Sequence, residues 1–497
     1  MAVNTLKRLN AMQSVRGLRQ PQDLDNPACV INAHQRCEHA LVDQALNERL
    51  FAYEQQVRGR FTSIVDLLKT LSGLQHELDF VARAQQLAQS QLGYNLPDSL
   101  LSRAWIGGLD LRVLYAHCIF SSFKSCVDAA AADQAPWLER MAIDEEFLQT
   151  CGFHTLDISP CADGRLQGLL PFVFRIAPSP AVGVKAYAGA LFDVEGDVND
   201  WMRREIERLS GSIAGGQDGN YLKMAVYHYS TSHSDHQGCA AHGSQDHLAT
   251  IAANDKLNEL RSAIDNTFGR GAAPETLLIG MDTDTDAIRV HLPDEQSVNC
   301  PLRYVDSAPI FKETLGLSQH SAREAISRAV TAAERQCGTR PGMKRLIERL
   351  LEANLSQIEY VIQHHEGRYA DIGHNERFIC AGEALSELQL RNKFYFAHLD
   401  TVEEGAADLD VGIKIFTGLN VSRGLPIPVL VHFHYCSRVP GARERTISRC
   451  QRVKSAIETR YASLNAQGLL HCQMALSDQD GSERCTWIDA SAPIAVH

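Results

Sequence analysis

The chain has 497 residues, 44% of them hydrophobic and 22% charged, with a formal net charge of −12. This length exceeds the size at which a single hydrophobic core keeps growing, so we expect several domains. The acidic balance excludes nucleic acid as the main partner, because phosphate contacts need a basic face. No apolar run is long enough to cross a membrane or to form a secretory h-region, so we expect a protein of the cytoplasm or of a structure assembled there.

The first third of the chain predicts a basic arm followed by a helical domain. Residues 1–25 contain four basic residues, Lys7, Arg8, Arg16 and Arg19. Their low apolar content predicts disorder, either as a plain solvated tail or as an arm that docks on an acidic partner. Residues 26–138 predict α-helices, because apolar residues from Ile64 to Leu74 recur at three- and four-residue spacing.

The remaining two thirds predict alternating strands and helices in two domains, residues 139–380 and 381–497. The predicted strands are Leu222–Ser230, Thr276–Met281, Ala287–Leu292, Pro428–Cys436 and Leu469–Ser477. The predicted helices are Asn199–Ser210, His247–Thr267, Pro341–Gln363, Ala384–Phe396 and Arg443–Leu464. The strand Val431–Ser437 resembles Val226–Ser230, which indicates that the last domain is a degenerate copy of the middle one. The fold class is therefore α/β (α+β) behind an α-helical domain.

An acidic segment, Asp282–Asp286, lies between two predicted strands with an aspartate at every second position. It resembles a calcium or magnesium loop, but it lacks the glycine and the distal glutamate of an EF-hand. We interpret it as a turn.

The segment with the most chemistry places Cys161, Asp163 and Arg165 at every second position. If the segment is extended, all three side chains project to the same side. The thiolate can hold a metal, the carboxylate can orient what the metal binds, and the arginine can hold the carboxylate ionised.

Further metal ligands are expected about 70 residues downstream, where His228 lies on a predicted strand and Cys239 in a glycine-flanked turn. With Cys161 they form a Cys₂His set, which leaves one open position and is typical of catalytic zinc. On spacing alone, four other histidines are equally suitable: His233, His236, His242 and His247. The alternative for each residue is an ordinary buried thiol, core histidine or loop ion pair.

Cys161–Arg165 resembles the Cys-x-Asp-x-Arg motif of β-class carbonic anhydrases, and the wider sequence resembles their divergent carboxysomal branch in α-carboxysomes. The matching segments include Cys151–His154, Asp157–Leu170, Lys185–Gly189, Ala225–Thr231, Gly238–Ser244, Asp282–His291, Asp371–His374, Ala397–Glu404 and Gly412–Pro428. The resemblance implies a β-carbonic-anhydrase-like catalytic domain and a C-terminal domain of similar fold without the site. It assigns zinc to Cys161, His228 and Cys239, and an orienting dyad to Asp163 and Arg165. The long interval between His228 and Cys239 fits only the carboxysomal branch.

The implied reaction is reversible hydration of CO₂ to bicarbonate by zinc-bound hydroxide, which supplies CO₂ to Rubisco inside the carboxysome. His374 lies where the family brings a further histidine to the site, and we expect it to act in proton transfer. The resemblance also implies a homodimer or higher homo-oligomer, and contact with Rubisco or shell proteins through the basic arm.

Three rival interpretations remain. A zinc deaminase would need a Cys-x-x-Cys pair, which the sequence lacks. A non-catalytic carboxysome scaffold would close the zinc shell with His242 or Asp163. Finally, a phosphorylated metabolite could bind as an effector at the basic stretch formed by Arg423, Arg438, Arg443 and Arg445.

Overall fold

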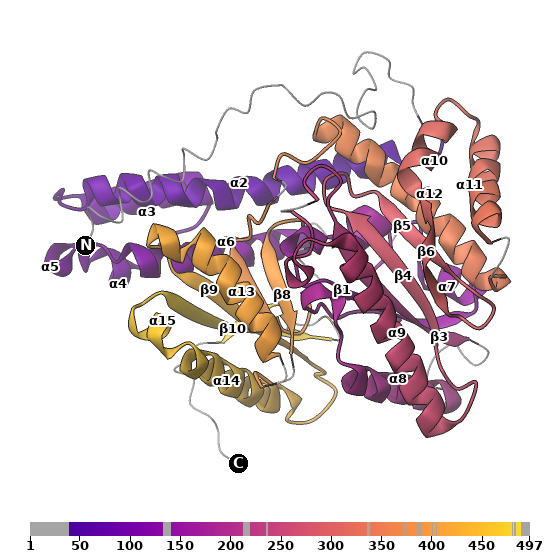
Figure 1. Cartoon of the computed structure of the whole chain (residues 1–497). Coiled ribbons are helices and arrows are strands. Elements are labelled where there is room, and N and C mark those ends of the chain that lie inside the picture. The colour runs from indigo at the N-terminus through magenta and orange to yellow at the C-terminus, as the bar shows by residue number, and fades with distance from the viewer. Residues whose placement is uncertain are drawn as a thin grey trace. The chain divides into compact units, whose positions relative to one another are not determined.

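The computed structural model describes residues 39–132, 141–211, 219–234, 237–334, 338–371, 373–385, 389–399, 401–403, 405–479, 481 and 484–488 (Figure 1). The predicted basic arm lies outside these residues. The chain divides into two compact units. The middle unit comprises residues 25–51 and 135–373, and the terminal unit comprises residues 1–24, 52–134 and 374–497. Among the described helices, none has the length and apolar content of a membrane span.

The middle unit is built on a six-stranded sheet in the order β2-β1-β3-β4-β5-β6. The strands are β2 (Val182–Val184), β1 (Phe153–Pro160), β3 (Asn220–Tyr229), β4 (Glu275–Asp282), β5 (Ile288–Pro293) and β6 (Asn299–Asp306). The first four in this order are parallel, and β5 and β6 are antiparallel additions at one edge. Every residue of β1 and β4 is buried, as expected for parallel strands that are covered on both faces.

Helices and short turns surround this sheet. The helices are α7 (Glu145–Thr150), α8 (Val194–Leu209), α9 (Asp246–Phe268), α10 (Ser307–Thr314), α11 (Gln319–Glu334) and α12 (Pro341–His364). Three 3₁₀ turns, η2 (Gly164–Leu166), η4 (Ala188–Ala190) and η5 (Ala240–His242), and the short π-helix η3 (Leu169–Phe174) lie between the longer elements. The long helix α9 packs against β3 and β4, with α8 beside it (Figure 1). Helix α12 begins with Pro341 at its first position, where the missing N–H costs nothing.

The terminal unit combines N-terminal helices with the C-terminal sheet. The helices are α2 (Gln44–Leu74, from Ala52 on), α3 (Phe80–Leu92), α4 (Asp98–Leu101), α5 (Ala104–Gly107) and α6 (Leu111–Ala132). Gly93 ends α3 in the left-handed conformation that glycine adopts without strain. The helical pattern that the sequence predicts for this region is confirmed.

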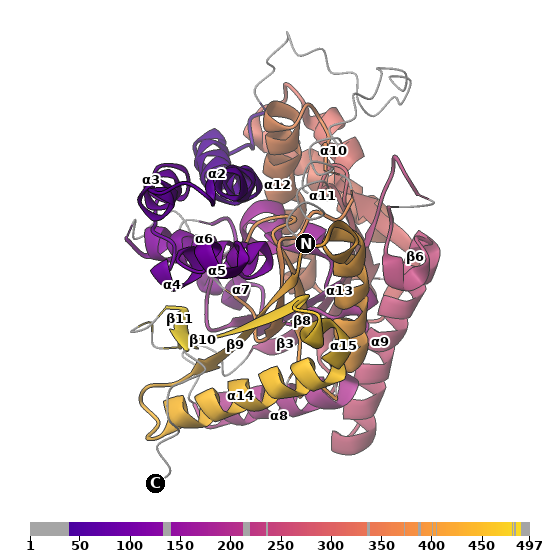
Figure 2. The same cartoon turned by 90° about the vertical axis from the view of Figure 1, so that its left-hand side faces the viewer.

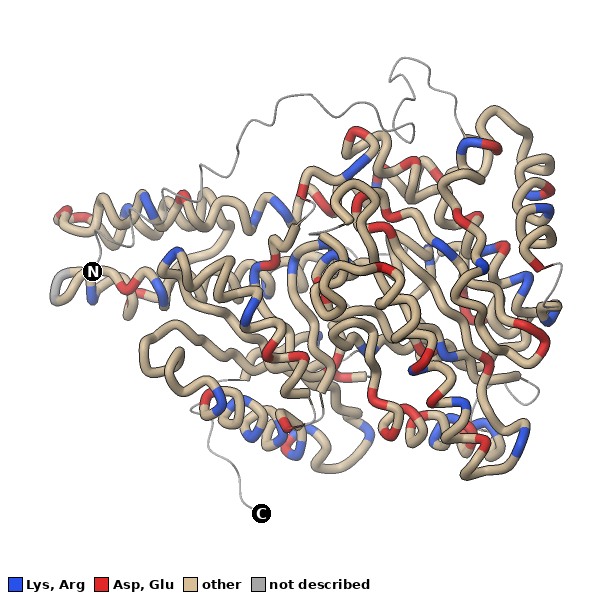
Figure 3. The backbone as a smooth tube through the Cα atoms, in the orientation of Figure 1, with Lys and Arg blue, Asp and Glu red and all other residues tan. Residues whose placement is uncertain are grey.

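The sheet of the terminal unit has five strands in the order β11-β10-β9-β7-β8. They are β7 (Phe378–Gly382), β8 (Phe394–His398), β9 (Ile427–Tyr435), β10 (Leu470–Asp478) and β11 (Thr486–Ile488). The connecting helices and turn are α13 (Ala406–Leu419), η6 (Val421–Arg423), α14 (Ala442–Arg460) and α15 (Ala462–Ala466). Helices α6 and α14 both pack on β9 and β10, from opposite sides in Figure 2. Basic side chains predominate along α14, whereas α8 carries both signs (Figure 3).

The two sheets repeat one arrangement. Strands β8, β7, β9 and β10 are parallel neighbours with an antiparallel β11 at the end, as β2, β1, β3 and β4 are with β5. The chain visits the corresponding strands in the same sequence order. The predicted α/β class and the similarity of the two domains are therefore confirmed.

The predicted helix Ala384–Phe396 is wrong. Phe394–His398 forms the parallel strand β8, and the described residues before it are not helical. Asn392 adopts a left-handed φ of 57°, which interrupts a helix. The run Phe394-Tyr395-Phe396 is typical of a buried strand. The alternation of apolar and polar residues around it is too short to reveal this strand in the sequence.

Candidate metal centre

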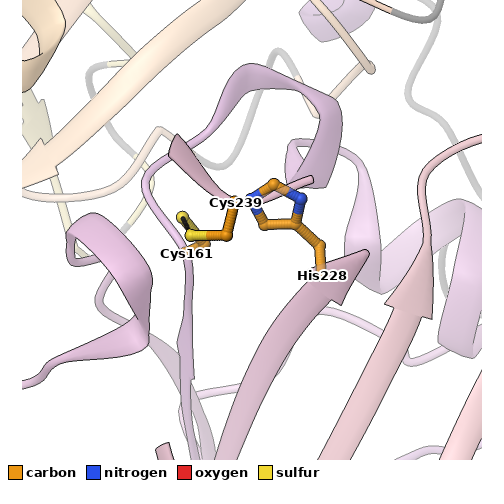
Figure 4. A group of neighbouring side chains, drawn as sticks. All are labelled: Cys161, His228 and Cys239. Carbon is orange, nitrogen blue, oxygen red and sulfur yellow. Dashed lines mark hydrogen bonds between the residues drawn. The ribbon is translucent and has the colours of Figure 1, made fainter. Parts of the chain in front are cut away.

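Three side chains converge where parallel strands of the middle unit end. Cys161 directly follows β1, His228 is the penultimate residue of β3, and Cys239 precedes the turn η5 (Figure 4). Because β1 and β3 are parallel neighbours, their carboxyl ends lie at the same edge of the sheet. The ligand atoms of Cys161, His228 and Cys239 all lie within 4.8 Å of one another, in a group that could hold a metal ion.

The donor atoms fit a zinc ion. The Sγ atoms of Cys161 and Cys239 are 3.9 Å apart, close to the separation of about 3.8 Å that two tetrahedral Zn–S bonds of about 2.3 Å would give. His228 is fully buried, and neither of its ring nitrogens makes a hydrogen bond. A buried imidazole without partners costs free energy, and a metal ion would remove that cost.

The two thiols influence each other's protonation. The hydrogen bond between them, and then burial, raises the pKa of Cys161 well above its usual range. The same hydrogen bond lowers the pKa of Cys239, and the backbone N–H groups of Ala241 and His242 lower it further. Cys239 is therefore the easier of the two thiols to deprotonate. A bound cation would favour two thiolates, since metal ligands must be deprotonated.

Asp163 and Arg165 form a buried ion pair next to these ligands. Nε and Nη2 of Arg165 donate to Oδ1 and Oδ2 of Asp163 at 2.9 and 2.7 Å. The sequence is compatible with an extended segment, but in the structure Asp163 caps the turn η2. Its Oδ1 also accepts a hydrogen bond from the Arg165 backbone N–H. Asp163 Oδ2 lies 3.6 Å from His228 Nε2. Since Arg165 engages both carboxylate oxygens, Asp163 is held beside the ligands in one orientation.

Arg165 also reaches the loop that carries the second cysteine. Its Nη1 and Nη2 atoms donate to the carbonyl oxygens of Gln237 and Gly238, directly before Cys239. One guanidinium therefore connects the Asp163 carboxylate to the Cys239 segment. Spacing in the sequence gives no signal of this second contact, because the partners are backbone atoms 72 and 73 residues away.

The other candidate histidines have different surroundings. His242 Nε2 bonds the Gly189 carbonyl, His233 Nδ1 bonds the Ser232 hydroxyl, and His247 is exposed on α9. His236 lies outside the described residues. His374 belongs to the terminal unit, where its Nδ1 atom lies 2.9 Å from Oε1 of Glu376. Its proposed role in proton transfer remains a prediction.

The acidic loop at the end of β4 holds the segment that follows His228. Asp284 accepts hydrogen bonds from the hydroxyls of Ser230 and Ser232, and Asp282 accepts one from Thr231. Burial, and then the neighbouring Asp284, raises the pKa of Asp282 to about 6. These carboxylates therefore anchor a turn, as the sequence predicts. Arg445 of the predicted basic stretch donates to the Pro440 carbonyl at the start of α14.

Family models match the chain in three consecutive segments. The model described as "Carboxysome Shell Carbonic Anhydrase, catalytic domain" matches residues 143–374. The corresponding N-terminal and C-terminal models match residues 39–131 and 375–492. The catalytic model thus covers the whole Cys161–His228–Cys239 site.

Relatives with the name carboxysome shell carbonic anhydrase match nearly the full length. The protein of Halothiobacillus neapolitanus (strain ATCC 23641 / c2) is 44% identical over 92% of this chain and 91% of that protein. The protein of Parasynechococcus marenigrum (strain WH8102) is 47% identical over 89% of this chain and 77% of its own length. That of Prochlorococcus marinus (strain MIT 9313) is 45% identical over 91% and 89%. The chain therefore belongs to the carboxysome shell carbonic anhydrase family.

Proposed function

We propose that this chain interconverts CO₂ and bicarbonate at a zinc ion held by Cys161, His228 and Cys239. The observation that carries the proposal is the set of three converging buried donors, with a sulfur–sulfur distance of 3.9 Å and an imidazole without a hydrogen-bond partner. Three protein ligands leave a tetrahedral zinc ion one open position. When bound, zinc would supply the Lewis acidity that makes water nucleophilic near neutral pH.

The Asp163–Arg165 pair would orient the water molecule that reacts at this open position. Asp163 would accept a proton or hydrogen bond from the reacting water and so orient its lone pair toward CO₂. Arg165 keeps that carboxylate ionised and, through two hydrogen bonds, prevents it from turning toward the metal. Both side chains are buried, so bulk water does not weaken the interaction. We assign proton transfer to the solvent to His374, whose usual pKa lies near neutrality.

The family places the enzyme in the carboxysome, where dehydration of bicarbonate is the useful direction because it releases CO₂ next to Rubisco. We propose that residues 1–25 form a basic arm that contacts Rubisco or a shell protein, and that the chain works as a homodimer or higher oligomer. We further propose the division into residues 26–138, 139–380 and 381–497. A Rubisco pull-down with the chain lacking residues 1–25 tests the arm. Undiminished capture of Rubisco by the shortened chain would contradict the proposed role of the arm.

The decisive experiment is stopped-flow CO₂ hydration with zinc assayed in parallel, on the native chain and on Asp163→Ala. We expect rapid hydration with one zinc per chain in the native protein. The variant should keep its zinc and lose most of the rate, since general acid–base groups typically contribute about 10²–10⁴-fold. Asp306→Ala, which removes a carboxylate that caps α10, is the matched control.

Stoichiometric zinc without hydration, under reducing and oxidising conditions and across pH, would contradict the proposal. It would favour the scaffold interpretation. If addition of a phosphorylated metabolite restored hydration, it would instead indicate an effector-gated enzyme that uses the basic stretch at Arg423, Arg438, Arg443 and Arg445.

A further inference from the structure

Two turns flank the cysteine ligands, η4 beside Cys161 and η5 directly after Cys239, and these turns touch. Cys161 pairs with Tyr187 in an isolated parallel bridge, and η4 starts at the next residue. Within η4, the backbone N–H of Gly189 donates to Sγ of Cys161, with N and S 3.2 Å apart. Hydrogen bonds of this kind to a ligand tune the electron density that it gives to a metal.

The Gly189 peptide is held from its other side by His242. The Nε2 atom of His242 lies 3.2 Å from the Gly189 carbonyl oxygen. A carbonyl oxygen only accepts, so Nε2 carries the proton in this contact. His242 itself ends η5, three residues after Cys239, and its backbone N–H bonds the Cys239 carbonyl. The ring thus joins the turn of one ligand to the turn of the other.

The backbone at Gly189 favours glycine. Its φ is +70°, and the following Ala190 also has a positive φ of 59°. A Cβ atom on Gly189 would lie 2.7 Å from His242 Nε2 and 3.0 Å from the Ala241 Cβ. Glycine is therefore favoured both by conformation and by the close approach of the histidine.

We propose that His242 is a positioning residue, which acts through Gly189 to aim a backbone N–H at the Cys161 sulfur. The inference rests on the proposed zinc site and deepens it. A thiolate that accepts this hydrogen bond gives less charge to the metal, so the metal remains a stronger Lewis acid. This matters in a site with two thiolates, which would otherwise neutralise the ion's charge.

The test uses the full-length chain loaded with Co²⁺ in place of Zn²⁺, and a chelator competition for Zn²⁺. His242→Leu removes the N–H donor, and we expect the thiolate-to-cobalt charge-transfer band to move to longer wavelength. Zinc affinity should fall about tenfold, as is usual for groups that support metal ligands, because the turn beside Cys161 is then no longer held in place. His242→Gln can still donate to the carbonyl and should restore both values. His247→Leu, which changes an exposed histidine, is the control and should leave both at the native value.

If His242→Leu does not fold, His242→Met provides a second variant of similar length without a donor. A native spectrum and native zinc affinity in either variant would overturn this inference and leave the proposed function intact. Failure of the native chain to bind zinc would overturn the proposed function and this inference with it.

Discussion

The sheet ends of the two units share one backbone framework but differ in the side chains that they carry. Cys161 N–H donates to the Val226 carbonyl in the middle unit, and Glu383 N–H donates to the His432 carbonyl in the terminal unit. Counting from these matched bonds, Glu383 stands in the place of Cys161, and His434 stands in the place of His228. The strand registers agree. His228 pairs with Met281 and His434 pairs with Ser477, and each of these partners is the residue before the aspartate that ends its strand.

Two further pairs of matching hydrogen bonds support this correspondence. Thr231 N–H donates to Asp282 Oδ1 at 3.2 Å, and Ser437 N–H donates to Asp478 Oδ1 at 3.1 Å. In the same way, Tyr187 N–H bonds the carbonyl of Pro160, and Leu399 N–H bonds that of Gly382. The backbone that places the ligands has therefore been kept in both sheets.

Among the described residues, the side chains at the second sheet end bond one another, and they form no group that could hold a metal ion. Glu383 Oε2 accepts from the backbone N–H of His434 and lies 3.0 Å from its Nδ1, and Arg449 donates to Oε1. Burial alone would raise the pKa of Glu383, but His434 and Arg449 outweigh it and lower the pKa to about 2. At the equivalent place His228 has no hydrogen-bond partner. The candidate metal site thus differs from the terminal sheet end in having a buried histidine without a hydrogen-bond partner.

The largest effect on zinc content and hydration rate is expected when Cys161 and its counterpart Glu383 are each replaced by alanine. Cys161→Ala should lose its zinc and fall to the uncatalysed rate of hydration, because two ligands do not hold a catalytic zinc ion. Glu383→Ala should keep its zinc, since the described residues at the terminal sheet end form no group that could hold a metal ion. Zinc content and stopped-flow hydration measure both. Zinc loss in Glu383→Ala alone would contradict the assignment of the sites.

A second, smaller effect is expected from Arg165→Lys. Lysine keeps the charge but cannot make the two parallel hydrogen bonds that hold Asp163, nor reach the carbonyls before Cys239 at the same time. The hydration rate should fall about 10–100-fold, as is typical when a group that orients a metal site is changed. Arg449→Lys in the terminal unit is the matched control and should leave the rate unchanged. Equal losses in the two variants would argue that the effect is structural.

The third effect is a difference in acid stability. His432 is fully buried where the middle unit has Val226, and burial lowers its pKa from 6.5 to about 3. The unfolded chain therefore binds a proton that the folded terminal unit excludes, so stability is complete above pH 6.5 and decreases as the pH falls toward 3. The slope approaches about 1.4 kcal/mol per pH unit for one group.

His432→Val should remove this slope, at a cost of about 1–3 kcal/mol at neutral pH, because Ser477 and the Glu383 carbonyl each lose one hydrogen bond. Hydrogen-exchange protection of the β9 and β10 amides, measured between pH 5 and 7.5, reports the local free energy of unfolding. The exposed His320→Val is the control. An unchanged slope in His432→Val would place the acid sensitivity elsewhere.

Sequence reasoning could identify strands rich in Val, Ile, Leu and Tyr, such as β3, β4 and β9, and the Cys161, Asp163 and Arg165 side chains that lie at the proposed site. It could not choose among the histidines, because the choice depends on which ring ends up buried without a partner. It gave Cys161–Arg165 the wrong local geometry, since Asp163 caps a turn through its own side chain. The correspondence of Glu383 with Cys161 is visible only in the strand registers.

The smallest effect separates the two matched aspartates at the sheet ends. Asp478→Asn should cost about 1 kcal/mol at pH 7.5, the usual worth of one weakened hydrogen bond. Asp282→Asn should cost less at this pH, because it also removes the repulsion from Asp284. Burial and Asp284 raise the folded pKa of Asp282 to about 6 from 3.8, so its charge weakens the middle unit progressively as the pH rises through this range. Urea unfolding at pH 4.5 and 7.5 should then show Asp282→Asn gaining relative to the native chain at the higher pH. A cost for Asp282→Asn that does not change with pH would mean that the hydroxyls of Thr231 and Thr285 already offset the repulsion.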